Sequence, residues 1–240
     1  SAPVNISIEL SDTDLAFLMT HDSDLFNRWQ AANKFATRAM LKGLDNPEST
    51  EAAAQHYAKA LSATLADTCL EDAYKAELLR LPSQSDIARE KRTNVDPEAI
   101  DRIHRTFARA NATALGSEIE AIYASASFTG PFSPDAKSAG RRALRNTALS
   151  LLSSRGSDAD LSRLESHYFN AGNMTEAAHA LALLAHHEIP AREKALQHFF
   201  ERWHHDHLVI DTWFAAQAQS SLPQTLDNVR ALTSHELFKI

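Results

Sequence analysis

Half of the twelve histidines lie in residues 185–214, and one of them opens a pattern close to the zinc-protease motif His-Glu-x-x-His. That motif needs two histidines one helical turn apart, a glutamate between them that acts as the base, and a third ligand from elsewhere. His187 and Glu188 begin it, but Ala191 occupies the fifth position and Pro190 would break the required helix. We therefore predict that this pair does not bind zinc.

Two further groups could bind a metal by residue type. His235 and Glu236 begin the same motif, but Lys239 stands at its fifth position, where a cation repels the metal. The other group is a run of neighbours in a predicted joint between two helices, His204, His205, Asp206 and His207. At most two or three of these side chains can turn toward one ion, and no second carboxylate or cysteine lies nearby in sequence. We interpret the run as a solvated turn that binds metal only adventitiously.

The rest of the sequence contains no motif for catalysis or cofactor binding. It lacks a glycine-rich phosphate loop, a nucleophile elbow and a GxGxxG pattern. The single cysteine, Cys69, excludes an internal disulfide and is predicted to be a small core residue. The net charge is −7, and 24 basic residues are interspersed with 31 acidic ones. We predict no catalytic, cofactor-binding or metal-binding residue in this chain and no nucleic-acid partner.

The composition favours a globular helical fold. Apolar residues make up 44% of the chain, whereas glycine (6) and proline (8) are scarce. No run approaches the roughly 18 apolar residues that span a bilayer, and no basic segment followed by an apolar one opens the sequence. These observations predict a cytoplasmic protein without a membrane partner.

Residues 1–10 carry the pattern of a half-buried β-strand. Val4, Ile6, Ile8 and Leu10 alternate with polar residues, which is the period of two that strands show. No partner strand can be recognised after it, and a lone strand is not stable because its backbone groups need a neighbour. We predict one orphan strand whose partners lie outside this sequence or in another chain.

From Ser11 onward the apolar residues recur with helical spacing. Capping residues predict helix starts at Ser11, at Asp24 and at Asp96, where a proline and an acid follow. We expect Gly43 to end the second of these helices, and the helix from Asp96 to continue almost to Ser125. Later helices are predicted over residues 158–169, 175–186, 191–203 and 208–219, with a last one after Pro223.

The joints between these helices are short, which favours antiparallel neighbours. The predicted fold class is all-α: an irregular α-solenoid, a HEAT- or armadillo-like stack of antiparallel helices, preceded by the orphan strand. His198 is expected at the boundary of the core. An aromatic cluster is predicted to belong to that core: Phe199, Phe200, Trp203, Trp213 and Phe214.

Several segments together resemble one family. They are residues 1–32, RRALRNTALSLL (141–152), YFNAGNMTEAAHALALL (168–184) and FFERWHHDHLVIDTWFAAQAQS (199–220). In order and nearly end to end they are similar to the C-terminal region of bacterial-type aminopeptidase N, a family of gluzincin zinc aminopeptidases. Within them, uncommon strings such as Phe-Asn-Arg-Trp and Leu-Val-Ile-Asp-Thr-Trp-Phe make the resemblance specific.

The resemblance implies that residues 1–10 are the last strand of a preceding β-sandwich domain. Residues 11–240 would be a helical C-terminal domain, truncated at its C-terminal end. The family's zinc ligands and catalytic glutamate have no counterpart here, so zinc would belong to the parent enzyme's catalytic domain. Residues 172–176, Gly-Asn-Met-Thr-Glu, look like the family's Gly-x-Met-Glu-Asn loop, but the threonine makes the string longer.

Three functions of different class follow as hypotheses, and the third is a small metal-binding protein built on the run at residues 204–207. In the first, the chain is the C-terminal fragment of a zinc-dependent aminopeptidase that removes N-terminal amino acids from peptides. The fragment would cap the active-site cavity, limit substrate access and be inactive alone, with the catalytic and β domains of the same polypeptide as partners. In the second, the chain is a free-standing α-solenoid that binds a protein or peptide.

Overall fold

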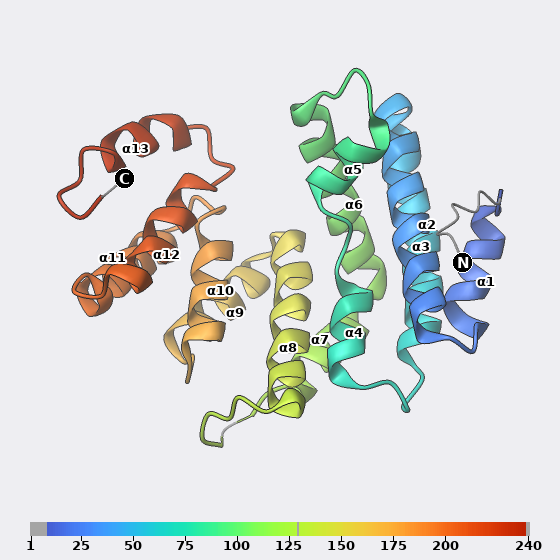
Figure 1. Ribbon diagram of the computed structural model, residues 1–240, viewed down its shortest axis with the longest axis horizontal. Coiled ribbons are helices and arrows are strands. Elements are labelled where there is room, and N and C mark those ends of the chain that lie inside the picture. The colour runs from blue at the N-terminus through green and yellow to red at the C-terminus, as the bar shows by residue number, and fades with distance from the viewer. Residues whose placement is uncertain (1–8, 129, 239–240) are drawn as a thin grey trace, which may run out of the picture. The chain divides into compact units, whose positions relative to one another are not determined.

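The computed structural model describes residues 9–128 and 130–238, and every regular element among them is a helix (Figure 1). The all-helical prediction is thus confirmed for this part of the chain. The strand predicted over residues 1–10 falls outside the described residues except for Glu9 and Leu10, which do not lie in a strand. No described helix is long and apolar enough to cross a membrane.

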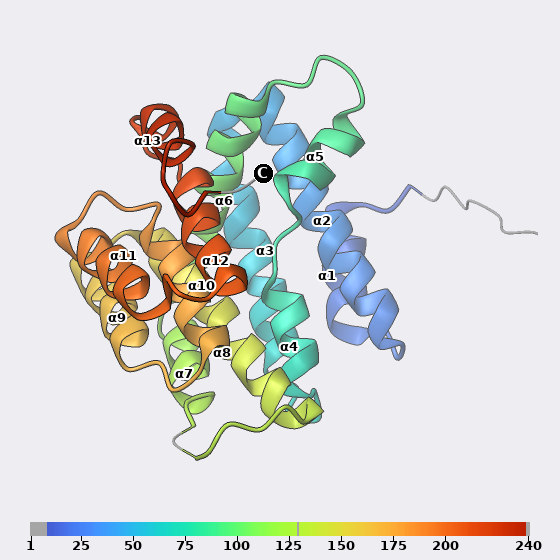
Figure 2. The same ribbon diagram turned by 60° about the vertical axis from the view of Figure 1, so that its left-hand side comes forward.

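The chain forms two compact units. Unit 1 comprises the described residues up to Ala126 together with Ala143–Arg155. In chain order its elements are α1 (Asp12–His21), α2 (Leu25–Asp45), η1 (Pro47–Ser49), α3 (Thr50–Leu65), α4 (Asp72–Leu79), α5 (Gln84–Lys91), α6 (Pro97–Leu115), α7 (Ser117–Ser125) and the later part of α8 (Ala136–Arg155). Helices α2, α3 and α6 lie side by side in both ribbon views (Figures 1 and 2).

Aromatic side chains join the three central helices of unit 1. The ring of Phe35 on α2 meets Tyr57 on α3 edge to face, with 5.7 Å between centroids. Tyr57 in turn lies 5.6 Å from the ring of Phe107 on α6, and all three side chains are buried. Burying large aromatic rings removes much apolar area from water, so this row contributes strongly to the stability of the unit.

Unit 2 contains the earlier part of α8 and the helices that follow it: α9 (Asp158–Phe169), α10 (Met174–Leu184), α11 (Pro190–Trp203), α12 (His207–Ala218) and α13 (Thr225–Leu232). These agree within a few residues with the predicted helices. Phe199 and Phe214 of the predicted aromatic core are buried, whereas Phe200, Trp203 and Trp213 are partly exposed. The indole Nε1 of Trp213 donates to the carbonyl of Leu196 at 2.9 Å, which ties α12 to α11.

Two predicted helix ends are wrong, and glycine explains both. Gly43 lies inside α2, where its lack of a side chain leaves room for neighbouring residues. A Cβ at this position would lie only 2.5 Å from Thr50 Oγ1 and 3.1 Å from Ile103 Cγ2. The glycine therefore permits close helix packing and does not end the helix. Conversely, the long helix expected to reach Ser125 breaks at Gly116, which separates α6 from α7. The φ of Gly116 is +53°, a backbone conformation that a helix does not contain.

Candidate functional site

The first zinc-like pair lies in the joint between α10 and α11. His187 is half-buried, and burial, followed by the nearby His186, lowers the pKa of its imidazole. The backbone amide of Ser221 donates to His186 Nδ1 at 3.1 Å, which ties this joint to the segment before α13. Pro190 is the first residue of α11, so the first and fifth positions of the motif do not lie on one helix. The geometry that the zinc motif requires is not formed.

The run at residues 204–207 covers the joint between α11 and α12 and the first residue of α12, His207. Its three histidines are exposed, and Asp206 is the N-cap of α12, accepting from the amides of Leu208 at 3.0 Å and Val209 at 3.3 Å. His204 Nδ1 lies 3.1 Å from the carbonyl oxygen of Phe200. The carboxylate that could have joined the imidazoles in a metal site therefore caps a helix.

His235 lies in the turn after α13, where it packs among aromatic rings. Its ring centroid is 5.5 Å from that of Phe200, 5.7 Å from Trp213 and 5.5 Å from Phe214, and its Nδ1 accepts the amide N–H of Leu237 at 3.1 Å. In the described part of the chain, no three His, Cys, Asp or Glu side chains gather closely enough to hold a metal. The donor set that zinc requires is not present there.

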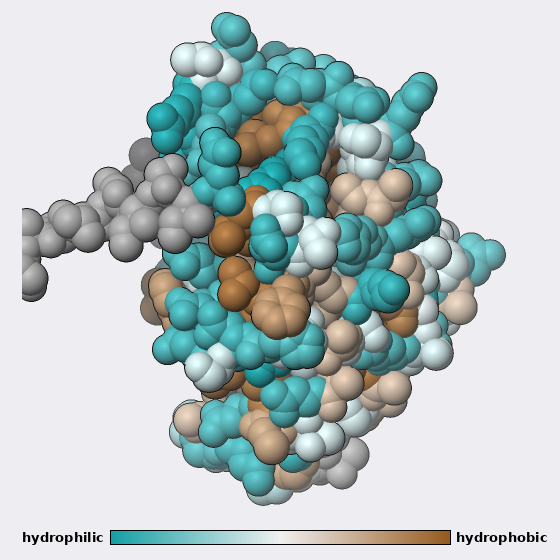
Figure 3. Space-filling view, turned by 90° about the vertical axis from the view of Figure 1, so that its right-hand side faces the viewer, coloured by the Kyte–Doolittle hydropathy of each residue, from teal (hydrophilic) through white to brown (hydrophobic). Residues whose placement is uncertain are grey.

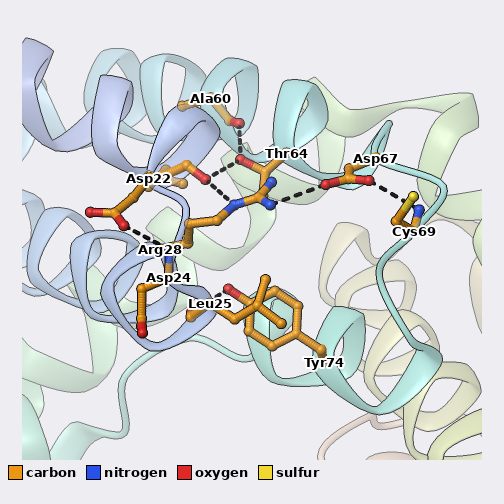
Figure 4. Close-up of polar contacts among 10 residues, drawn as sticks. Asp22, Asp24, Leu25, Arg28, Ala60, Thr64, Asp67, Cys69 and Tyr74 are labelled. Carbon is orange, nitrogen blue, oxygen red and sulfur yellow. Dashed lines mark hydrogen bonds and ion pairs between the residues drawn. The ribbon is translucent and has the colours of Figure 1, made fainter.

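A charged cluster in unit 1, which sequence reasoning missed, is centred on the buried Arg28 of α2 (Figure 4). Its Nε donates to the carbonyl of Met19 at the end of α1, at 3.0 Å, and a terminal nitrogen meets Asp67 Oδ2 at 3.1 Å. The hydroxyl of Thr64 on α3 approaches the same Met19 carbonyl at 3.0 Å. We call Met19, Arg28, Thr64 and Asp67 the Arg28 cluster.

The loop between α3 and α4 completes this arrangement. The backbone amide of Cys69 donates to Asp67 Oδ1 at 3.0 Å. This bond, followed by the hydrogen bond from Arg28, holds the pKa of the Asp67 carboxyl below its ordinary value of 3.8. Cys69 itself is exposed, so its predicted place in the core is wrong. The carboxylate instead orients the loop that carries the cysteine.

The Arg28 cluster positions helices and offers no reaction centre. The Arg28 side chain is only 8% exposed, so its guanidinium cannot reach a ligand in solvent. Its bonds fix the end of α1 and the α3–α4 loop to α2, and the hydroxyl of Tyr74 donates to the carbonyl of Leu25 at 2.6 Å nearby. A sequence signal for this burial exists: Arg28 precedes the buried Ala31, Ala32 and Phe35 at helical spacing.

Several residues in the strings that carried the family resemblance have structural roles in the fold. Arg28 belongs to Phe-Asn-Arg-Trp, and Trp213 belongs to Leu-Val-Ile-Asp-Thr-Trp-Phe. In the string at 172–176, Asn173 is the N-cap of α10: its Oδ1 accepts the amide of Glu176 at 3.0 Å, and its Nδ2 donates to the Glu176 carboxylate at 2.8 Å. Each of these residues builds a cap, a buried cluster or a helix contact.

Comparisons with known proteins agree on one group. Residues 12–240 match the model of the family described as a domain of unknown function (DUF3458_C) with ARM repeats. The chain is 38% identical over 241 residues to aminopeptidase N of Caulobacter vibrioides (strain ATCC 19089 / CIP 103742 / CB 15), covering 100% of this chain and 28% of that protein. It is 33% identical over 240 residues to aminopeptidase N of Escherichia coli (strain K12), covering 99% of this chain and 27% of the relative.

A solved structure is also similar. The crystal structure of Legionella pneumophila aminopeptidase A in complex with aspartic acid matches with a TM-score of 0.84 and 25% sequence identity. That match covers 99% of this chain and 29% of the other. The present chain thus spans less than a third of the length of each of these proteins.

Proposed function

Because the chain belongs to the DUF3458_C family of ARM-repeat domains and corresponds to a C-terminal domain of aminopeptidase N, we propose that it is the helical C-terminal part of a zinc-dependent aminopeptidase. That parent enzyme removes N-terminal amino acids from peptides in the cytoplasm. Zinc and the reacting groups belong to a catalytic domain outside this chain. The helical part stacks as an irregular α-solenoid and has no activity alone.

In this proposal the chain acts by covering the active-site cavity of the parent enzyme. A helical cover excludes water and large substrates, so that only peptides small enough to enter with a free N-terminus are cleaved. Its partners are the catalytic and β domains of the same polypeptide. The Arg28 cluster suits this role, because a cover must keep its shape while it contacts another domain. The cluster fixes α1 and the α3–α4 loop to α2.

One observation carries the proposal: the alignment to aminopeptidase N extends over the whole chain at 38% identity. The similarity of the fold to the Legionella structure, with a TM-score of 0.84 over 99% of this chain, supports the same architecture.

Activity of the full-length polypeptide tests this function. The full-length protein with zinc is expected to release alanine from a chromogenic alanyl amide, and the 240-residue chain with zinc is expected to release none above background. Release by the 240-residue chain at a rate near that of the full-length protein contradicts the proposal. So does a full-length reading frame that begins near Ser1, which would favour the free-standing binding module instead.

A further inference from the structure

Two histidines of unit 2 differ from the side chains on the surface of unit 1. On the side of the molecule that carries α1, hydrophilic side chains surround a few apolar ones, which is the mixed character of a solvated face (Figure 3). His186 and His235 instead accept backbone amides near α13. A ring nitrogen accepts an N–H only while it carries no proton itself. Each contact therefore depends on the protonation state of its histidine.

Before α13, the joint between α12 and α13 is attached to the joint between α10 and α11. Ser220 Oγ, which is buried, donates to the carbonyl of Ala185 at 2.7 Å. The backbone amide of Ser221 donates to His186 Nδ1 at 3.1 Å, and Ser221 Oγ lies 3.2 Å from the same nitrogen. The imidazole of His186 thus contributes directly to holding the two joints together.

After α13, the turn is held by His235. Its ring packs against Phe200 of α11 at 5.5 Å between centroids, and against Trp213 and Phe214 of α12 at 5.7 Å and 5.5 Å. Its Nδ1 accepts the amide N–H of Leu237 at 3.1 Å. The backbone of this turn is therefore joined to the packed ring while Nδ1 is unprotonated.

Helix α13 lies between these two contacts and buries no residue of its own within the described chain. Helices in proteins are usually held by burial of an apolar face. Here the position of α13 depends instead on the joint before it and the turn after it, where Phe238 also meets the ring of Phe214 at 5.6 Å. We call residues 219–238 the α13 segment.

The surroundings of His186 favour its neutral form. The facing joint, residues 219–224, contains no ionisable side chain, and the nearest ionisable residue of α10 in sequence is His179. His187 is half-buried, and burial, followed by His186, lowers the pKa of its imidazole. Glu188 is exposed, so water and salt screen its charge. Positive charge is thus disfavoured in this joint.

The rings that pack against His235 carry no charge. The ionisable side chains that lie close in sequence to these rings or to His235 are exposed to water, which screens them. They are Glu201, Arg202, His204, Asp211 and Glu236. The bond from the Leu237 amide is therefore the contact of His235 that a proton on Nδ1 would remove.

We propose that the α13 segment is a pH-sensitive latch, docked on α10, α11 and α12 while His186 and His235 are neutral and released when both are protonated. A proton on each Nδ1 leaves the amides of Ser221 and Leu237 without their acceptors. Ser221 Oγ can accept from protonated His186, but the Ser221 amide still loses its partner. A further proton on His187 places two positive charges side by side.

The pH range of release follows from the chemistry of imidazole. An unperturbed histidine titrates near pH 6.5, so the latch should be closed above about pH 7 and should open as the pH falls toward about 5. The lowered pKa of His187 acts in the same direction, because its contribution to stability is complete above about pH 6.5 and is lost as the pH falls through the folded-state pKa. All these contacts lie within unit 2, so the latch is independent of the proposed function.

Amide hydrogen exchange of the full-length polypeptide at about pH 7.5 and about pH 5.5 tests the latch. After correction for the intrinsic pH dependence of exchange, the opening equilibrium of amides in residues 225–238 is expected to rise about tenfold at the lower pH, as the loss of two hydrogen bonds predicts. Peptides from α9 are the internal control and should not change. An unchanged opening of residues 225–238 overturns the proposal, and so does an equal rise in α9, which would mean that the whole unit loosens.

A pair of double variants identifies the groups responsible. His186→Gln with His235→Gln supplies side-chain oxygens that accept an N–H at every pH, so the rise in opening at about pH 5.5 should disappear. His205→Gln with His207→Gln, at exposed positions of the same unit, should keep the rise. A rise that persists in the first pair contradicts the latch.

The imidazole nitrogens give a direct measurement in the unmodified protein. If the glutamine pair fails to dock even at about pH 7.5, the 15N chemical shifts of His186 and His235 at that pH decide the question. Neutral rings protonated at Nε2 support the latch. A proton on Nδ1 of either ring overturns it.

Discussion

Arg28 in unit 1 and the histidines at 204–207 in unit 2 are all ionisable, but they differ in burial and in what their atoms bind. The Arg28 side chain is 8% exposed and joins the carbonyl of Met19 to the carboxylate of Asp67. The three histidines are exposed, and the acid beside them caps a helix. Residues of the types that bind metals thus form an ordinary turn. Arg28, which belongs to no recognisable motif, connects α1, α2 and the α3–α4 loop.

The difference shows which property gives a charged residue a role. A buried charge must be paired, since leaving it unpaired in a medium of low dielectric constant costs several kcal/mol. Water can hydrate an exposed imidazole, so the protein need not supply a partner for it. Neighbouring histidines therefore need not point toward one another. Burial of Arg28, and not the clustering of histidines, therefore indicates where substitution has consequences.

Replacing the buried arginine should have the largest effect on stability. Arg28→Met keeps much of the aliphatic length but removes both charge-assisted bonds, so we expect unit 1 to lose about 3 kcal/mol of unfolding free energy. Urea titration gives the total, and amide hydrogen exchange in α2 and α3 assigns the loss to unit 1. Arg28→Lys should recover little, because an ammonium lacks the planar fork that reaches two partners.

An exposed arginine of the same unit is the matched control. Arg89 on α5 is 74% exposed and pairs with Asp86 at 3.1 Å. Exposed pairs contribute little, so Arg89→Met should change the unfolding free energy by less than about 0.5 kcal/mol. Equal losses for the two variants would mean that burial does not distinguish the Arg28 cluster.

Much of the fold could be predicted because its helix starts use strong local signals. Ser11, Asp24 and Asp96 are N-caps whose side chains accept backbone amides, as their residue types suggested. The break at Gly116 was not predictable from spacing, since Ile119 of α7 continues the apolar pattern of α6. Helix α5 was missed because Ile87 is its single buried residue, which gives too weak a pattern.

The site was harder to predict than the fold, for a different reason. Metal motifs could be rejected from the sequence by local tests, such as the lysine at the fifth position of the His235 pair. The Arg28 cluster joins residues 39 positions apart, Arg28 and Asp67, and such pairing depends on how α3 packs against α2. Exposure of Phe26 is likewise a tertiary property, because its spacing from Trp29 fits the apolar face of an amphipathic helix.

The dependence of stability on acidic pH should also distinguish the Arg28 cluster from exposed ion pairs, through the titration of the Asp67 carboxyl. The pKa of the Asp67 carboxyl in the folded state lies below 3.8, mainly because of the hydrogen bond from the Cys69 amide and then because of Arg28. Its contribution to the free energy of unfolding is therefore complete above pH 3.8 and is lost as the pH falls through the folded-state pKa. Asp67→Asn removes this titration, and the stability of the variant should fall less steeply between about pH 5 and about pH 2. Urea titrations across that range measure the slope. Asp45→Asn, at an exposed pair with Lys91, serves as the control.

The smallest effect is expected where the sequence looks most like chemistry. The triple variant His204→Ala, His205→Ala, His207→Ala should change the unfolding free energy of unit 2 by less than about 0.5 kcal/mol, because exposed side chains with few partners contribute little. Asp206→Ala in the same joint should cost about 1 kcal/mol, since it removes the N-cap of α12. Calorimetry with zinc supplies the second measurement. Stoichiometric binding by the unmodified chain tighter than about micromolar, abolished in the triple variant, would restore a metal role for the run and reverse the comparison with Arg28.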